Sequence, residues 1–89
     1  MKEEELQENL ESVLAQLEIE LRYEKGDFRG GLCRVKDKKI CLINKGLPLS
    51  QKNLLIARSL SELDLSNIFM VPAVRKFIES TVAQSKLEA

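Results

Sequence analysis

Residues 40–63, ICLINKGLPLSQKNLLIARSLSEL, decide the fold class that we predict for this chain. Residues 40–43 are all apolar, without alternation, which is typical of a central strand that is covered on both faces. Residues 44–48 form a loop, and Ser50 is a suitable N-cap for a helix at about residues 50–63. The apolar stripe of this helix comprises Ile56, Leu60 and Leu63.

The residues before this segment predict one more helix and two more strands. Apolar residues at helical spacing predict an amphipathic helix at about residues 3–17, with glutamates on its opposite face. Residues 19–24 alternate between apolar and charged, as expected for a half-buried strand. The glycine-rich residues 25–31, KGDFRGG, form a turn before the next strand.

Residues 32–43, LCRVKDKKICLI, predict a hairpin whose turn lies around residues 36–39. In the simplest register Val35 faces Ile40 and Cys33 faces Leu42, which places Cys41 on the other face from Cys33. A three-residue loop would slip the pairing by one residue and bring the two cysteines opposite each other. The sequence leaves both registers open.

The C-terminal part predicts a last helix with Pro72 in its first turn. Its apolar stripe comprises Val74, Phe77, Ile78 and Val82. We therefore expect a single domain over residues 1–89. Its fold class is α+β, with the element order αβββαα and helices packed on a three-stranded antiparallel sheet.

Charge is strongly segregated along the chain, although the net charge is zero. Residues 1–24 hold eight acids and two bases, whereas residues 25–58 hold nine bases and two acids. A hydrophobic fraction of 44% is ordinary for a folded chain. The overall balance therefore hides an acidic first helix and a basic middle.

Composition argues against several kinds of function. The chain has no histidine, and so lacks the commonest general base and metal ligand. The polar N-terminus, MKEEELQENLE, does not read as a secretory signal, and no apolar run is long enough to span a membrane. We expect a cytoplasmic protein with reduced cysteines, no cofactor, no metal and no membrane contact.

Residues 31–63 resemble the core of the ImmA/IrrE family of zinc metallopeptidases. That family has a hairpin ending in a strand like IxIN, a short loop and a helix reading AHELGH, and here ICLIN precedes a loop and a helix. If Ala57 matches the first alanine, Arg58 and Glu62 stand at the two histidines and Ser59 at the glutamate. The metal and catalytic motif is absent, so the resemblance implies only a shared architecture and no catalytic residue.

The glycine-bordered basic hairpin is the first candidate site. Its residues for contact with an anion or a nucleic acid are Arg29, Gly30, Gly31, Arg34, Lys36, Lys38 and Lys39. Bases can meet phosphates, and glycines let backbone N–H groups approach an anion. Alternatively, the lysines keep a strand edge soluble and the glycines form a wide turn.

Cys33 is the second candidate, as a reactive thiol. Nearby bases such as Arg34 would lower its pKa if they converged on it. Its apolar neighbours Leu32 and Val35 favour a buried packing role instead, and we expect Cys41 to be buried as well.

The leading functional hypothesis is a non-catalytic interaction or regulatory module that self-associates as a dimer or binds a protein partner. The amphipathic terminal helices and the segregated charge favour it. The alternatives are nucleic-acid binding through residues 29–39, and a small enzyme or redox sensor that uses Cys33.

Overall fold

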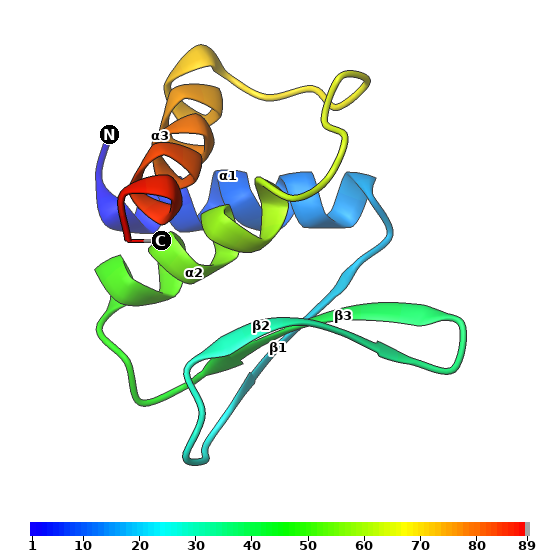
Figure 1. Cartoon of the computed structure of the whole chain (residues 1–89). Helices are drawn as coiled ribbons and strands as arrows, with labels where there is room; N and C mark the ends of the chain where they lie inside the picture. Colours follow the sequence, from blue (N-terminus) through cyan, green and yellow to red (C-terminus); the bar gives the residue numbers. More distant parts are fainter. Residues whose placement is uncertain (89) are drawn as a thin grey trace.

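Three helices and three strands follow one another in the order αβββαα (Figure 1). The computed structural model describes the backbone of residues 1–88 and the side chains of residues 1–82. The elements are α1 (Glu3–Gln16), β1 (Glu20–Glu24), β2 (Gly30–Val35), β3 (Lys38–Asn44), α2 (Leu49–Leu60) and α3 (Pro72–Glu88). The α+β class and the element order expected from the sequence are confirmed.

The sheet is mixed, with the strand order β1-β3-β2. β2 pairs antiparallel with β3, but β1 pairs parallel with β3, with Glu20 beside Ile40. This differs from the wholly antiparallel sheet that the sequence suggested. The five residues between β1 and β2 carry the chain two strand spacings away, and β3 then returns into the gap between them. The apolar residues 40–43 are thereby central, as predicted.

The β2–β3 hairpin has a two-residue turn, Lys36 and Asp37, so its register differs from both that we considered. Cys33 lies opposite Ile40, and Val35 lies opposite Lys38. The shift from the simplest register is two residues, and such a shift keeps every side chain on its face. Cys33 and Cys41 therefore lie on opposite faces, as that register predicted.

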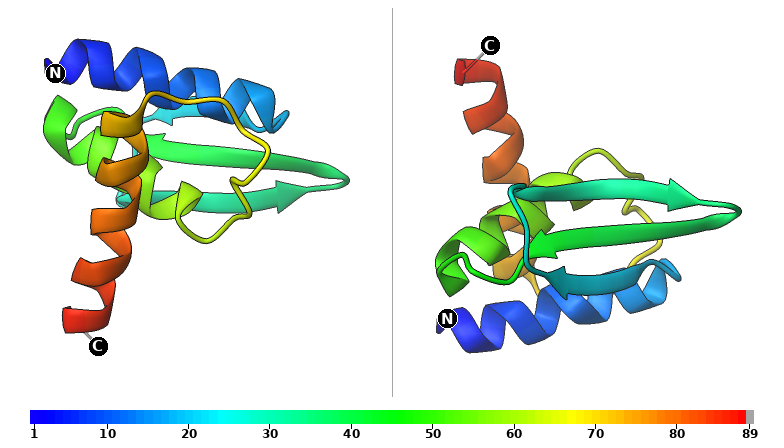
Figure 2. Two further views of the ribbon diagram at one scale, coloured as in Figure 1. Left: turned by 90° about the horizontal axis from the view of Figure 1, so that it is seen from above. Right: turned by 90° about the horizontal axis from the view of Figure 1, so that it is seen from below.

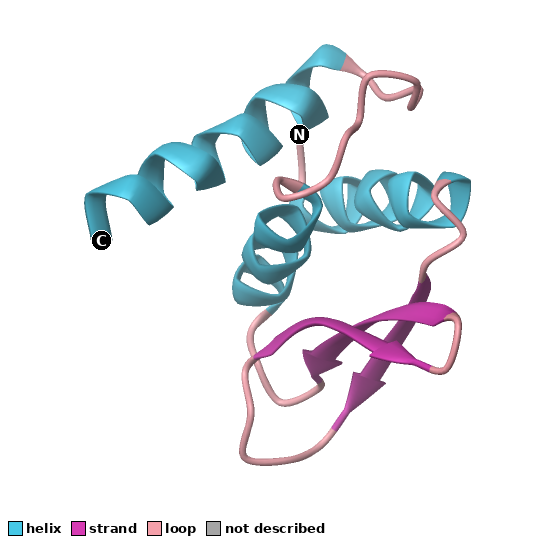
Figure 3. Cartoon of the chain, turned by 45° about the vertical axis from the view of Figure 1, so that its right-hand side comes forward, coloured by secondary structure: helices cyan, strands magenta, loops and turns pink. Residues whose placement is uncertain are grey.

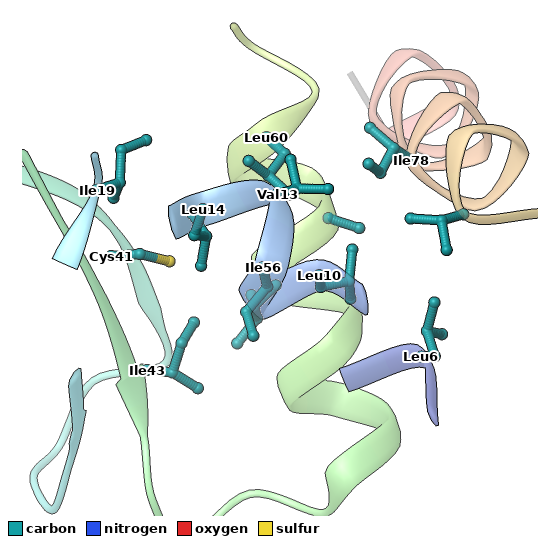
Figure 4. Close-up of a cluster of buried hydrophobic side chains, with 13 residues drawn as sticks. Leu6, Leu10, Val13, Leu14, Ile19, Cys41, Ile43, Ile56, Leu60 and Ile78 are labelled. Atoms are coloured by element: carbon teal, nitrogen blue, oxygen red, sulfur yellow. The ribbon is translucent and has the colours of Figure 1, made fainter. Parts of the chain in front are cut away.

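All three helices lie on one side of the sheet (Figure 3). The inner face of the sheet contributes Cys41 and Ile43 to a core that is otherwise formed largely by α1 and α2 (Figure 4). The buried apolar residues of this core are Leu6, Leu10, Val13, Leu14, Ile19, Cys41, Ile43, Leu55, Ile56, Ala57, Leu60, Val74 and Ile78. The predicted stripes of the three helices thus meet in one cluster, with two kinds of exception. Leu17, Leu63 and Phe77 are half-buried and pack against the cluster, and Val82 is 37% exposed.

In the described part of the chain, no helix lies on the outer face of the sheet (Figure 2). The expectation that β3 is covered by elements on both faces is therefore wrong. Ile40, on the outer face, is nevertheless only 6% exposed, although it does not belong to the core cluster. Ile40 lines a hollow of about 500 Å³ together with residues that include Arg22 and Val35 of the flanking strands.

Helix α2 begins one residue after Pro48, so the predicted N-cap role of Ser50 is wrong. The carbonyl of Pro48 accepts hydrogen bonds from the backbone N–H groups of Gln51 and Lys52, both at 3.0 Å. Pro48 itself lies outside the helix with φ −58° and ψ 152°. Because proline fixes φ near the helical value, the turn can start directly behind it.

None of the helices in the described part of the chain is long and apolar enough to cross a bilayer.

Helix α1 ends in a Schellman motif that uses a glutamate where glycine is usual. The Glu18 N–H donates to the Ala15 carbonyl and the Ile19 N–H to the Leu14 carbonyl, each at 3.0 Å. Glu18 has a left-handed φ of 59°. The apolar contact that accompanies this motif is formed here by the buried pair Leu14 and Ile19, which direct the chain into β1.

Candidate functional site

The turn end of the β2–β3 hairpin extends beyond the helices (Figure 2). Arg34 and Lys39 are cross-strand partners there, so their side chains share the inner face of the sheet. Lys38 lies on the outer face opposite Val35, and Lys36 is in the turn with a left-handed φ of 59°. All four bases are exposed, which gathers positive charge around one end of the hairpin.

Arg29, Gly30 and Gly31 lie at the other end of β2, and Arg29 is about 17 Å along the strand from Arg34 at the usual rise per residue. The Arg29 Nη2 donates to Gln51 Oε1 at 3.2 Å, next to the start of α2. The structure therefore divides the predicted basic site in two. Arg29 and the glycines form one part, and the bases of the turn form the other.

The two glycines belong to β2 and do not form a wide turn. Their φ angles, 145° for Gly30 and 156° for Gly31, are ones that L-residues rarely adopt. A Cβ atom on Gly30 would lie 2.6 Å from the Leu42 carbonyl oxygen. A Cβ atom on Gly31 would meet nothing within 4 Å, so the backbone is open to a neighbour at that point.

A hollow of about 590 Å³ separates the end of α1 from the inner face of the hairpin. Its lining is Leu17, Glu18, Ile19, Glu20, Arg34, Asp37, Lys38 and Lys39. Both signs of charge line this hollow, with the acids mostly on the α1–β1 side and the bases on the hairpin. It is therefore not a uniformly positive pocket for an anion.

Cys33 and Cys41 have opposite environments. Cys33 is exposed on the outer face, so the expectation that it packs in the interior is wrong. Cys41 is fully buried, as predicted, and burial raises the pKa of its thiol to about 11, although a hydrogen bond with Ser59 opposes the shift. Cys41 is thus an inert core residue, and the role of Cys33 as a reactive thiol stays a prediction.

A polar cluster around Tyr23 was not predicted from the sequence. Gln7 Nε2 donates to the Tyr23 hydroxyl at 2.9 Å, and the hydroxyl donates to Glu11 Oε2 at 3.1 Å. Lys52 Nζ lies 5.4 Å from the centre of the ring. Burial, and then the charge of Glu11, raise the pKa of Tyr23, while the hydrogen bond from Gln7 lowers it. The cluster joins β1 to α1 and α2. Because these contacts engage both its hydroxyl and its ring, Tyr23 is not available to stack on a nucleobase.

Phe69 is another feature that periodicity did not reveal. Its side chain is 83% exposed, yet its backbone is held on both sides by one side chain. Gln16 Nε2 donates to the Phe69 carbonyl at 2.7 Å, and the Phe69 N–H donates to Gln16 Oε1 at 2.9 Å. The loop before α3 is thereby fastened to the end of α1.

The positions that the metallopeptidase resemblance singled out do not form a metal-binding face. Ser59 is buried, and its hydroxyl donates to the Leu55 carbonyl at 3.0 Å. Arg58 is half-buried in the last turn of α2, whereas Glu62 is exposed beyond the helix, which ends at Leu60. Within the described residues, no group of three or more acids and cysteines is arranged to hold a metal ion.

Comparisons with family models, curated proteins and solved structures find no significant match to this chain. The resemblance of residues 31–63 to the ImmA/IrrE family therefore stays a prediction.

Proposed function

We propose that this protein is a non-catalytic interaction module and that the β2–β3 hairpin is its contact surface for another polypeptide chain. One observation carries the proposal: among the described residues, no helix covers the outer face of the hairpin, where the apolar Val35 lies opposite Lys38. Val35 is 54% exposed there and Cys33 is also exposed. A partner that covered these side chains would remove apolar surface from water, at about 25 cal/mol per Å².

Charge supports association with a second copy. The exposed glutamates of α1 and the exposed bases of the hairpin have opposite signs and belong to different layers of the molecule. The acidic helix of one copy complements the basic hairpin of another. Such complementarity speeds association and selects the partner more than it adds affinity.

Sedimentation equilibrium tests the proposal on the wild-type protein and two variants. Val35→Glu places a charge on the outer face, and Val71→Glu is the matched control because Val71 is 40% exposed before α3. We expect the wild type and Val71→Glu to self-associate alike and Val35→Glu to remain monomeric. Equal behaviour of the two variants would remove the hairpin as the contact.

A wild-type chain that stays monomeric at every concentration would direct the search to a different partner protein. The same pair of variants then serves in affinity capture from lysate of the native host, after nuclease treatment. A stoichiometric protein that binds wild type and Val71→Glu but not Val35→Glu is the expected result.

Nucleic-acid binding through residues 29–39 is the second candidate, and the close pairing of Arg34 with Lys39 favours it. It predicts an affinity that falls steeply with salt and with the combined change of Lys36, Lys38 and Lys39 to glutamate. Unchanged binding of a single-stranded oligonucleotide after those changes would eliminate this candidate.

A further inference from the structure

The free edge of β2 presents unused backbone hydrogen-bonding groups. Among the strands of residues 1–88, β2 pairs with β3 alone, in the sheet order β1-β3-β2. The Asn44 N–H donates to the Arg29 carbonyl at 3.0 Å, which makes this pair a hydrogen-bonded one. Because hydrogen-bonded pairs alternate along an antiparallel ladder, Gly31, Cys33 and Val35 also face β3. The backbone groups of Gly30, Leu32 and Arg34 therefore point away from the sheet.

This edge lacks most devices that keep a strand from pairing. Proline, bulges and several charges are the usual ones, and β2 contains a single charged residue, Arg34. Gly31 has open space where a side chain would be. A glycine in a strand often marks the close approach of another backbone. Four of the six residues of β2 are exposed, and Gly31 and Leu32 are half-buried.

We propose that an extended, acidic segment of a partner protein adds to the free edge of β2 as a fourth strand. The inference rests on the proposed function and names the class of partner. Backbone hydrogen bonds to Gly30, Leu32 and Arg34 provide a share of the affinity that does not depend on sequence.

Charge determines the chemistry of the segment. Residues 29–39 hold five bases and one acid, so carboxylates on the incoming strand meet an opposite potential. A carboxylate beside Arg34 forms a cross-strand ion pair. Pairing of β2 with β2 of a second copy would instead bring two basic hairpins side by side, at distances where their like charges repel each other.

Labelled peptides of six residues test the inference against the full chain. The probes are an alternating glutamate–valine peptide, its lysine–valine counterpart, and the glutamate peptide with alternate backbone amides N-methylated. We expect binding by fluorescence anisotropy for the first probe alone. Equal binding of the N-methylated probe would overturn strand addition, and equal binding of the lysine probe would overturn the acidic preference.

Amide hydrogen exchange locates the bound peptide. The amides of Leu32 and Arg34 point outward, so they gain protection when the acidic peptide binds. The amides of Cys33 and Val35 already donate to β3 and change little. Protection that appears elsewhere in the chain, with none at Leu32 and Arg34, would contradict the inference.

Two substitutions of Arg34 separate the contribution of its side-chain charge to peptide affinity from that of its backbone N–H. Arg34→Gln removes the charge but keeps the outward N–H, and we expect affinity for the acidic peptide to fall by about fivefold or less, as for an exposed ion pair. Arg34→Pro removes both and is tolerated on an edge strand, so we expect a loss of about tenfold or more. Dispersed amide resonances verify that each variant is folded, and equal affinities for the two would refute strand addition.

Peptide binding tests this inference, whereas the effect of Val35→Glu on association tests the proposed function, so the failure of one can be told from the failure of the other. If the acidic peptide does not bind but Val35→Glu still abolishes association, the strand-addition inference is wrong and the proposed function stands. If Val35→Glu leaves association unchanged, the proposed function is wrong. Tight binding of a single-stranded RNA that Arg34→Gln weakens as much as Arg34→Pro would replace both with nucleic-acid binding.

Discussion

Arg34 and Lys39 lie directly opposite each other in the hairpin, at a pair of positions that exchange no backbone hydrogen bonds. Side chains are closest at such pairs, and like charges placed there destabilise a sheet. Among residues 1–82, the one ion pair within 4.0 Å is that of Arg22 with Glu20, so no carboxylate at that distance neutralises Arg34 or Lys39. The hairpin thus keeps a repulsive pair at its exposed end.

Reversing one charge of this pair should stabilise the protein. Arg34→Glu replaces repulsion with a cross-strand ion pair, and we expect the free energy of unfolding to rise by about 0.5 kcal/mol. Urea denaturation at low salt measures the change, and Arg34→Gln, which only removes the repulsion, should lie between Arg34→Glu and the wild type. The same Arg34→Glu variant should no longer bind the acidic peptide. A decrease in its free energy of unfolding would show that Arg34 and Lys39 do not repel each other.

Replacing the left-handed glutamate at the end of α1 should also be stabilising. Glu18 has φ 59° in the Schellman motif, where a side chain costs about 1–2 kcal/mol and glycine does not. After the entropy that glycine loses on folding, we expect Glu18→Gly to raise the free energy of unfolding by about 0.5–1 kcal/mol. Glu18→Ala keeps the Cβ atom, so its midpoint in urea should not increase.

The two glycines of β2 should differ in their tolerance of a methyl group. Gly30→Ala meets the Leu42 carbonyl oxygen at 2.6 Å in addition to its unfavourable φ, so we expect a loss of about 3 kcal/mol. Gly31→Ala encounters only the unfavourable φ and should cost about 1–2 kcal/mol. Thermal denaturation of both variants gives the order, and a reversed order would mean that the register of Gly30 against Ile43 is wrong.

Stability should decrease in alkaline solution because of Cys41. Burial raises the pKa of its thiol from 9.0 to about 11, so between these pH values the unfolded chain releases a proton that the folded chain retains. Deprotonation then favours unfolding, and we expect a loss of about 2–3 kcal/mol across this interval. Cys41→Ala serves as the control: its stability should be lower at neutral pH but should decline less from pH 9 to 11.

Local periodicity predicted the helices and the central strand because each of them buries one regular stripe. The i, i+4 spacing of Leu6, Leu10 and Leu14 matches buried residues, and all but Leu42 of the apolar run 40–43 are buried. Strand direction has no such local pattern. Whether β1 lies parallel or antiparallel to β3 depends on where the intervening strand lies, which no short window of sequence contains.

The hairpin register and the exposure of Cys33 could not be predicted for related reasons. The two-residue turn at Lys36 and Asp37 lacks the usual asparagine–glycine pair, so no local signal favoured one turn length over another. Cys33 has apolar neighbours in sequence but lies on the face without helices. Arg34, Lys36, Lys38 and Lys39 lie on the hairpin, whereas Arg29 precedes β2, and this division required the structure.

The central position of β3 constrains the order in which the chain can acquire structure during its synthesis. β1 and β2 both pair with β3 and not with each other, so neither has a strand partner until residue 44 has left the ribosome. The hairpin can then close locally, whereas β1 must be captured across a loop of more than a dozen residues. Until that capture, Leu21 and Tyr23 remain without their sheet neighbours, in a segment whose eight acids favour solubility.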